Sequence, residues 1–283
     1  FEVDLSDDNV AAAADRQVVS AADWSTTRET ESIAQASTLE LLAGWELVDW
    51  LDVADLDSEA DHNYAWWQQS APPGFVTEVY RHDYHVCGVE SPGCTATDGG
   101  RVLTGGESFT VSTRPGEDLM LVTRVHGRSS VALTITVNDG WQAQRIQPAV
   151  PGRWLEVVTW IPAEQITGTR TAIKITAEMD DPALAYMPYA HWVYQGNYVP
   201  ETLVEPGDLR AEIGGAQLVS AEIERSDDQL DVILTWQGDA PRMGDGVLFV
   251  HVIDDPDAEP VAQTVIRPGG GVLPPGNWLP GQI

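Results

Sequence analysis

The sequence predicts an all-β protein of two sandwiches, with a short helical segment at its N-terminus. Three segments in the middle of the chain alternate apolar and polar residues with a period of two: Leu119–Val125, Val131–Val137 and Thr171–Ala177. Their β-branched residues and their period are typical of half-buried strands. Turn-forming residues separate them, as at Asn138-Asp139-Gly140, whose first two residue types tolerate positive φ. An aromatic run from Tyr186 to Tyr194 supplies a further strand.

Length and composition set the domain organisation. A chain of 283 residues has room for about two domains, and a hydrophobic content of 43% is enough for a packed core. We expect an N-terminal arm and helix over 1–45, a first sandwich over 46–196 and a proline- and glycine-containing linker over 197–207. Residues 208–283 show the strand pattern of a smaller, immunoglobulin-like sandwich. This second unit is short for such a sandwich, so we expect the protein to continue beyond both ends of the sequence.

The charge excludes one class of partner. The chain has 15 basic and 44 acidic residues, and its formal net charge is -29. Such a surface repels phosphate backbones, so the protein is not expected to bind nucleic acid. The same charge favours solubility in a salty or exposed setting. No apolar run approaches the roughly 20 residues that cross a bilayer, so we expect contact with a membrane only through segments outside this chain.

The two cysteines indicate the compartment. Cys87 and Cys94 flank six residues that include Pro92 and Gly93, and such a loop can bring two thiols within bonding distance. A zinc site would need a second Cys or His pair at ligand spacing, which the neighbouring sequence lacks. We therefore predict a structural disulfide and an oxidising, extracytoplasmic location, secreted or at the cell surface.

An acidic segment follows the first predicted strand and suggests a cation site. Oxygen ligands clustered on one loop suit Ca²⁺, and the candidate ligands are Asp52, Asp55, Asp57 and Glu59. The spacing is not that of an EF-hand, because the glycine of the sharp turn and the closing glutamate are missing. The alternative is a solvated acidic loop without metal.

Tryptophan supplies the candidate ligand-binding residues. An indole ring can fill a sandwich core or present an apolar face to a sugar ring. Trp154, Trp160 and Trp236 alternate with strand periodicity, so we expect them in the core. Trp66, Trp67 and Trp141 lie in turn-rich segments and are the candidates for an exposed binding platform.

Several motifs give the chain a resemblance to known families. The segment from Asp49 to Tyr64 resembles galactose-binding-like jelly-roll modules of bacterial surface proteins, as do Gly105-Gly106-Glu107-Ser108-Phe109, Pro151-Gly152-Arg153-Trp154 and His191-Trp192-Val193-Tyr194. Residues 230–283 are similar to the β-sandwich that ends glycosyltransferase-like membrane proteins of the bacterial envelope, through Leu234-Thr235-Trp236, Phe249-Val250-His251-Val252 and the glycine–proline run after Pro268. These motifs are turns and core aromatics, so they imply a fold and not a reaction.

The resemblance and the composition together imply a function class. Motifs of serine hydrolases, phosphate-binding loops and zinc proteases are missing from the sequence. We therefore expect a non-catalytic binding or assembly protein of the cell envelope that recognises envelope glycan or a surface protein. The first alternative is an accessory ectodomain of a membrane-bound, glycosyltransferase-like enzyme. The second is a hydrolase, because paired carboxylates are uninformative among 44 acidic residues.

Overall fold

The computed structural model of the protein divides into two compact units, Phe1–Asn197 and Tyr198–Ile283. The structure describes residues 42, 44–69, 79–85, 95–150, 154–179, 185–199, 212–213, 216–226, 229–238, 248–252, 259–260, 262–266 and 275–280. The predicted N-terminal arm and helix lie almost wholly outside the described residues, and so does the predicted disulfide between Cys87 and Cys94.

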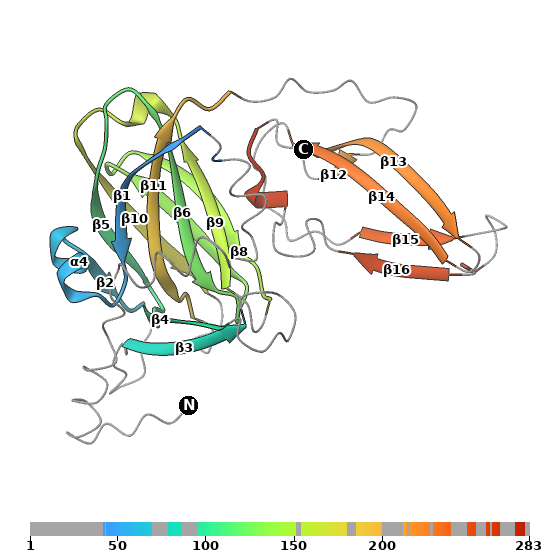
Figure 1. Ribbon diagram of the computed structural model, residues 1–283, viewed down its shortest axis with the longest axis horizontal. Coiled ribbons are helices and arrows are strands. Elements are labelled where there is room, and N and C mark those ends of the chain that lie inside the picture. Colours follow the sequence, from blue (N-terminus) through green and yellow to red (C-terminus); the bar gives the residue numbers. More distant parts are fainter. Residues whose placement is uncertain are drawn as a thin grey trace, which may run out of the picture. The chain divides into compact units, whose positions relative to one another are not determined.

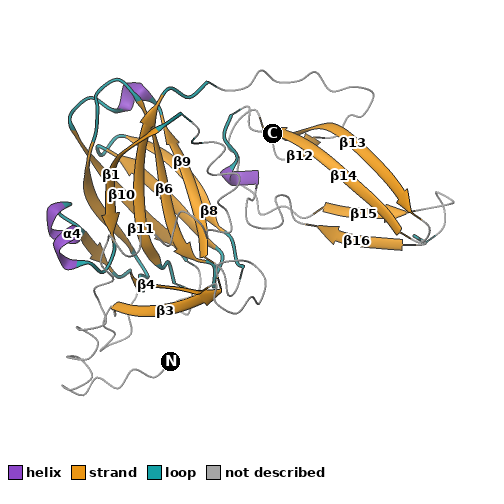
Figure 2. Cartoon of the chain, viewed as in Figure 1, coloured by secondary structure: helices purple, strands orange, loops and turns teal. Residues whose placement is uncertain are grey.

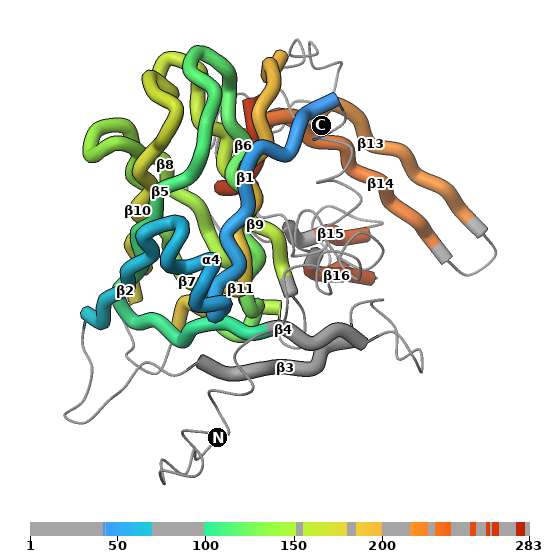
Figure 3. Tube along the Cα trace, turned by 60° about the vertical axis from the view of Figure 1, so that its left-hand side comes forward, coloured from blue at the N-terminus to red at the C-terminus, as the bar shows by residue number. Residues whose placement is uncertain are grey.

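The first unit is a sandwich of two antiparallel sheets, as the sequence predicts (Figures 1 and 2). One sheet has four strands in the order β1 (Glu46–Asp52), β11 (Pro188–Gly196), β6 (Asp118–His126) and β9 (Trp154–Ile161). The other has five, in the order β2 (Ala65–Trp67), β5 (Gly106–Ser112), β10 (Arg170–Glu178), β7 (Val131–Val137) and β8 (Trp141–Gln147). Strands β3 (Val79–His85) and β4 (Thr95–Arg101) form a separate antiparallel hairpin. Figure 3 shows the strands of the sandwich from a second direction.

Alternation along the strands builds the core. In β7 and β10 every second residue is buried and the residues between them are exposed or half-buried. The buried set meets the inner face of the four-stranded sheet, and burying one such side chain contributes about 1.5–3 kcal/mol. The core between the sheets includes Leu51, Phe109, Val111, Leu119, Leu121, Leu133, Ile135, Val157, Ile173, Ile175 and Val193.

The outer faces of the two sheets differ. On the four-stranded sheet even outward side chains such as Trp192, Arg124 and Met120 are buried. Arg124 forms an ion pair of 2.6 Å with Glu156 and lies 5.2 Å from the centre of the Trp192 ring. Among the described residues the outward side chains of β5, β10 and β7 are instead small, polar and solvent-accessible. The five-stranded sheet therefore offers the open face of the sandwich.

A short helix replaces the predicted acidic loop. Helix α4 (Leu56–Asp61) begins after Asp55, whose side chain accepts hydrogen bonds from the backbone N–H groups of Asp57 and Ser58. An aspartate at the N-cap and acidic residues in the first turn stabilise a helix start. The prediction of an extended loop was wrong because it counted the carboxylates as possible ligands and overlooked the capping position.

The second unit contains two small antiparallel sheets. Strands β12 (Glu212–Ile213), β13 (Ala216–Ser226) and β14 (Gln229–Gly238) form one sheet, and β15 (Leu248–Val252) and β16 (Ala262–Ile266) form the other. A 3-10 turn, η3 (Pro275–Asn277), follows. The immunoglobulin-like arrangement itself stays a prediction. In the part of the chain that the structure describes, no helix combines the length and the apolar character needed to span a membrane.

Candidate functional site

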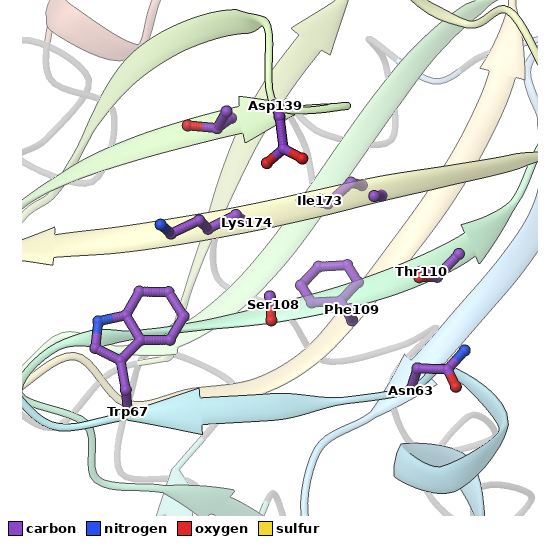
Figure 4. A pocket seen from close by; sticks show the side chains of 10 residues that line it. Asn63, Trp67, Ser108, Phe109, Thr110, Asp139, Ile173 and Lys174 are labelled. Carbon is purple, nitrogen blue, oxygen red and sulfur yellow. The ribbon is translucent and has the colours of Figure 1, made fainter.

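A hollow of about 570 Å³ lies on the open face of the five-stranded sheet. It is lined by Asn63, Trp67, Ser108, Phe109, Thr110, Thr136, Asp139, Ala172, Ile173 and Lys174. Figure 4 shows Trp67 and Lys174 at one end of the hollow and Asn63 and Thr110 at the other. Except for Trp67, the outward residues of the floor are small or flexible, so the sheet itself is accessible to a ligand.

Strand register brings these side chains together from distant parts of the sequence. Lys174 on β10 is paired with Ser108 on one side and Thr136 on the other. In the next row Gly106 is paired with Trp67 and with Thr176. Cross-strand neighbours have Cβ atoms about 4.5–5.5 Å apart. Hydroxyl groups, one ammonium group and one indole ring therefore share a single patch.

Two glycines make room for the indole ring. A Cβ atom added to Gly105 would lie 2.5 Å from a Trp67 ring carbon. One added to Gly106 would lie 2.1 Å from the carbonyl oxygen of Ile175 and 2.7 Å from the Trp67 ring, and the φ of Gly106 is +150°. Only glycine fits such a backbone at this distance. The Gly105-Gly106 pair therefore lets the Trp67 ring approach the backbone of β5 closely.

Replacing Gly106 with alanine is expected to lower the free energy of unfolding by about 2–4 kcal/mol, because overpacking and positive φ both add cost. It should also displace Trp67 from the hollow. Gly116→Ala is the matched control, since Gly116 has a φ of +78° and no atom within 4 Å of an added Cβ. Urea unfolding of both variants measures the difference. Equal destabilisation would show that the close approach to Trp67 is unimportant.

Turns with left-handed residues position the two polar ends of the hollow. Asn63, with a φ of 52°, follows α4. Asn138 and Asp139, with φ values of 50° and 56°, form the turn between β7 and β8. The side chain of Asn138 holds this turn on β10, because its Oδ1 accepts from the Ala172 N–H at 3.1 Å. Asp139 is left at the rim, and Figure 4 shows its carboxylate above β10.

A buried network under the floor holds β5 in place. Glu107 is completely buried and accepts hydrogen bonds from the hydroxyls of Tyr64 at 2.8 Å and Tyr186 at 2.5 Å. The Nε2 atom of His191 lies 3.0 Å from the same carboxylate. Burial and the charge of Glu107 raise the pKa of both tyrosines well above its usual range. The hydroxyls therefore stay protonated and keep donating to Glu107.

A buried ion pair attaches α4 to the strand next to the site. Arg101 donates two hydrogen bonds to Glu59, from Nε at 2.7 Å and from Nη2 at 2.6 Å. Glu59 also accepts from the Ala54 N–H at 2.9 Å. The guanidinium carbon of Arg101 lies 5.8 Å and 5.7 Å from the ring centres of Tyr64 and Trp66. These contacts fix the chain that leads into Trp67.

Two of the four predicted calcium ligands have other partners in this structure. Asp55 caps α4 and Glu59 pairs with Arg101. Asp57 is exposed, and Asp52 is buried at 2% exposure. Among the described residues no group of three or more His, Cys, Asp or Glu side chains is arranged to hold a metal ion. Calcium binding by these residues stays a prediction.

Asp52 is an unusual carboxyl group. Its Oδ2 atom is buried without a hydrogen-bond partner in the described part of the chain. Burial, followed by the nearby carboxylates of Asp55 and Glu59, raises the pKa of Asp52 from 3.8 to about 8. The group is therefore protonated in the folded protein at neutral pH.

The three candidate tryptophans are not brought together. Trp67 lines the hollow. Trp66 is paired with the buried Glu107, points toward the core side of the sheet edge and is 38% exposed. Trp141 is paired with the buried Val137 at the start of β8, and it does not line the hollow. The face of the sheet on which each ring lies depends on whether its cross-strand partner points inward or outward. This pairing cannot be predicted from a turn-rich sequence.

The sequence analysis did not identify four other lining residues as functional: Asn63, Ser108, Asp139 and Lys174. One signal could have found Lys174, because it is the only lysine in the chain and lies at an outward position of a predicted strand. The expected core positions of Trp160 and Trp236 are half-buried, and the Trp154 side chain lies outside the described residues.

Comparisons with known proteins give distant structural likenesses only. No protein-family model and no curated protein matches the chain. One similar solved structure is that of the tandem CBM22 domains of Xyn10C from Paenibacillus barcinonensis, with 12% sequence identity and a TM-score of 0.30. The match covers 74% of this chain and 65% of that chain. A family 35 carbohydrate-binding module from Clostridium thermocellum has 14% identity, 41% and 90% coverage, and a TM-score of 0.23.

An exo-β-1,3-galactanase from Phanerochaete chrysosporium has 15% identity, a TM-score of 0.26 and a match over 43% of this chain. The chain spans 28% of the length of that enzyme. At these scores the likenesses carry no conclusion about ligand or activity. The resemblance to glycosyltransferase-like envelope proteins stays a prediction.

Proposed function

We propose that the first unit is a non-catalytic glycan-binding module of an extracytoplasmic envelope protein, and that saccharide binds in the hollow on the five-stranded sheet. The observation that supports this most directly is the Trp67 ring beside a row of hydroxyl groups. The C–H face of a pyranose is apolar and packs on an indole ring, while its hydroxyls need polar partners. Ser108, Thr110, Thr136 and Asn63 provide such partners.

The carboxylates of the site favour binding over hydrolysis. Glycoside hydrolysis uses two carboxyl groups, about 5–9.5 Å apart, on either side of the bond that breaks. Asp139 is the one carboxylate among the described residues that line the hollow. Glu107 lies beneath the floor, fully buried and held by two tyrosine hydroxyls. A single exposed carboxylate suits a hydrogen-bond acceptor for sugar hydroxyls.

The matched pair Trp67→Ala and Trp141→Ala tests the site. Removing Trp67 is expected to weaken the affinity for neutral oligosaccharides by about tenfold or more, because a stacking contact of about 1.4 kcal/mol is lost. Trp141 lies outside the hollow, so its removal should change the affinity less than about twofold. Isothermal titration calorimetry against a panel of xylo-, gluco-, manno- and galacto-oligosaccharides measures both.

A panel that gives no heat and no change in tryptophan fluorescence with the unmodified protein would count against glycan binding. Equal effects of the two substitutions would place the binding surface elsewhere. Circular dichroism of both variants checks that the sandwich is intact.

A further inference from the structure

We infer that the hollow selects saccharides that bear a carboxylate, with Lys174 as the group that recognises the acid; this inference rests on the proposed function. Lys174 is the only lysine of a chain whose formal net charge is -29. It projects outward from β10, the middle strand of the five-stranded sheet, and it lines the hollow. A single ammonium group at the centre of the open face is an obvious partner for an anion.

The ammonium group is available to a ligand. Lys174 is exposed, and its Nζ atom lies 5.2 Å from the centre of the Trp67 ring. Among the described residues no carboxylate lies within ion-pair distance of it. An exposed cation–π contact is weak compared with a charge-assisted hydrogen bond to a carboxylate. A carboxylate that enters the hollow can therefore draw the ammonium away from the ring.

When the Lys174 ammonium group leaves the Trp67 ring for a carboxylate, the ring becomes free to contact the sugar. One side of the Trp67 ring packs against the glycine pair, as the Cβ distances at Gly105 and Gly106 show. Lys174 occupies the ring in the absence of ligand. When its ammonium group pairs with the acid, the apolar face of the same sugar residue can take its place on the indole. One uronate residue thus satisfies both groups at this end of the hollow.

The other charged groups on this face determine at which end of the hollow the carboxylate of the ligand is expected to bind. Asp139 lines the hollow and would repel a carboxylate, but its oxygens accept hydrogen bonds from sugar hydroxyls. Arg170, also outward on β10, donates from Nη2 to the carbonyl oxygens of Asp61 at 3.3 Å and Thr110 at 3.4 Å. Glu178 lies further along the strand, where it accepts from Thr134. The carboxylate is therefore expected at the end formed by Lys174 and Trp67.

The high net charge does not prevent this selection. At physiological ionic strength the Debye length is about 8 Å, so exposed charges beyond that distance are largely screened. The acid in contact with Lys174 then responds mainly to the charges that line the hollow. The surplus of acidic residues instead disfavours non-specific attachment of polyanions to the rest of the surface.

The test compares polymers that differ only in the acid. Polygalacturonate, alginate and hyaluronate are each titrated beside their carboxyl-reduced forms, at about 0.15 M salt, with the unmodified protein, Lys174→Gln and Asp139→Asn. We expect at least one acidic polymer to bind about tenfold more tightly than its reduced form. Lys174→Gln should remove that preference and leave binding of the reduced polymer equal or stronger, since the ring face becomes free. Asp139→Asn removes a charge that repels the acid, so the preference for the acidic polymer should persist or increase in this variant.

Each outcome of these titrations supports or overturns the selection of acidic saccharides by Lys174. Equal binding of every polymer and its reduced form, or binding of the reduced forms alone, would overturn the selection of acid while leaving glycan binding intact. A preference that persists in Lys174→Gln would move the recognition to another group. Binding of none of these polymers would also overturn the inference, and the neutral oligosaccharide titration then judges the proposed function separately.

Discussion

Replacing Arg101 with alanine is expected to lower the free energy of unfolding by about 3–5 kcal/mol, because a buried ion pair that loses one partner leaves an uncompensated charge. The pair with Glu59 has side-chain exposures of only 9% and 10%. The change would also remove the cation–π contacts of the guanidinium group with the rings of Tyr64 and Trp66. We therefore expect weaker glycan binding as well, since the same chain segment continues into Trp67.

A second variant distinguishes the effect of the unpaired Glu59 charge from the effect of the packing that is lost in Arg101→Ala. Arg101→Met combined with Glu59→Gln removes both charges and keeps the side-chain oxygen that accepts from the Ala54 N–H. Replacing a buried ion pair by neutral groups of similar volume is often close to neutral in stability, so most of the loss should be recovered. Differential scanning calorimetry of the chain measures both variants. A double variant as unstable as Arg101→Ala would mean that the geometry of the pair, and not the stranded charge, is what matters.

Replacing Asp52 with asparagine is expected to stabilise the protein above neutral pH. The folded pKa of about 8 lies above the ordinary aspartate value of 3.8, so the folded state holds a proton that the unfolded state releases. The stability that this proton provides is complete below pH 4 and is lost as the pH rises through about 8. The pKa is raised by about four units, and each unit corresponds to about 1.4 kcal/mol, so the gain at pH 8 should be on the order of 5 kcal/mol.

Among the described residues the Oδ2 atom of Asp52 has no hydrogen-bond partner. Asparagine at position 52 also supplies an N–H donor at this place. At pH 4 the substituted and unmodified proteins should be nearly equal in stability, because Asp52 is then neutral in the folded state. Asp57→Asn, an exposed change in the neighbouring helix α4, is the control for the loss of one carboxyl group from this segment. A stability difference that stays constant between pH 4 and pH 9 would contradict the raised pKa.

The long alternating strands could be predicted from the sequence, and the site only in part. The bounds of β6, β7 and β10 agree closely with the predicted strands Leu119–Val125, Val131–Val137 and Thr171–Ala177, although burial alternates only in β7 and β10 and is nearly continuous in β6. β8 was missed because its outward row of Gln142, Gln144 and Ile146 and its inward Arg145 blur the alternation. Arg145 is tolerated in the core because its Nε donates to the Val158 carbonyl at 2.9 Å.

The hollow could not be assembled from sequence because its residues come from separate segments that only register brings together. Trp67 lies on a three-residue edge strand that is too short to show a period. Whether its ring or that of Trp66 faces outward depends on the pairing with Gly106 and Glu107. Asn63 depends on where α4 ends, and the helix itself was not predicted. Sequence could name the kind of side chain that binds sugar but not the face that presents it.

Glu107 and Ser108 are neighbours in β5, one bonded inside the sandwich and the other lining the hollow. A floor held this firmly cannot reshape itself around a ligand, so under the proposed function little conformational entropy would be left to lose on association. Diversification of specificity would then proceed by exchanging the rim side chains, Trp67, Asn63, Asp139 and Lys174, over an unchanging base. Under the same proposal, relatives with different sugar preferences should keep the buried glutamate and vary the four positions above it.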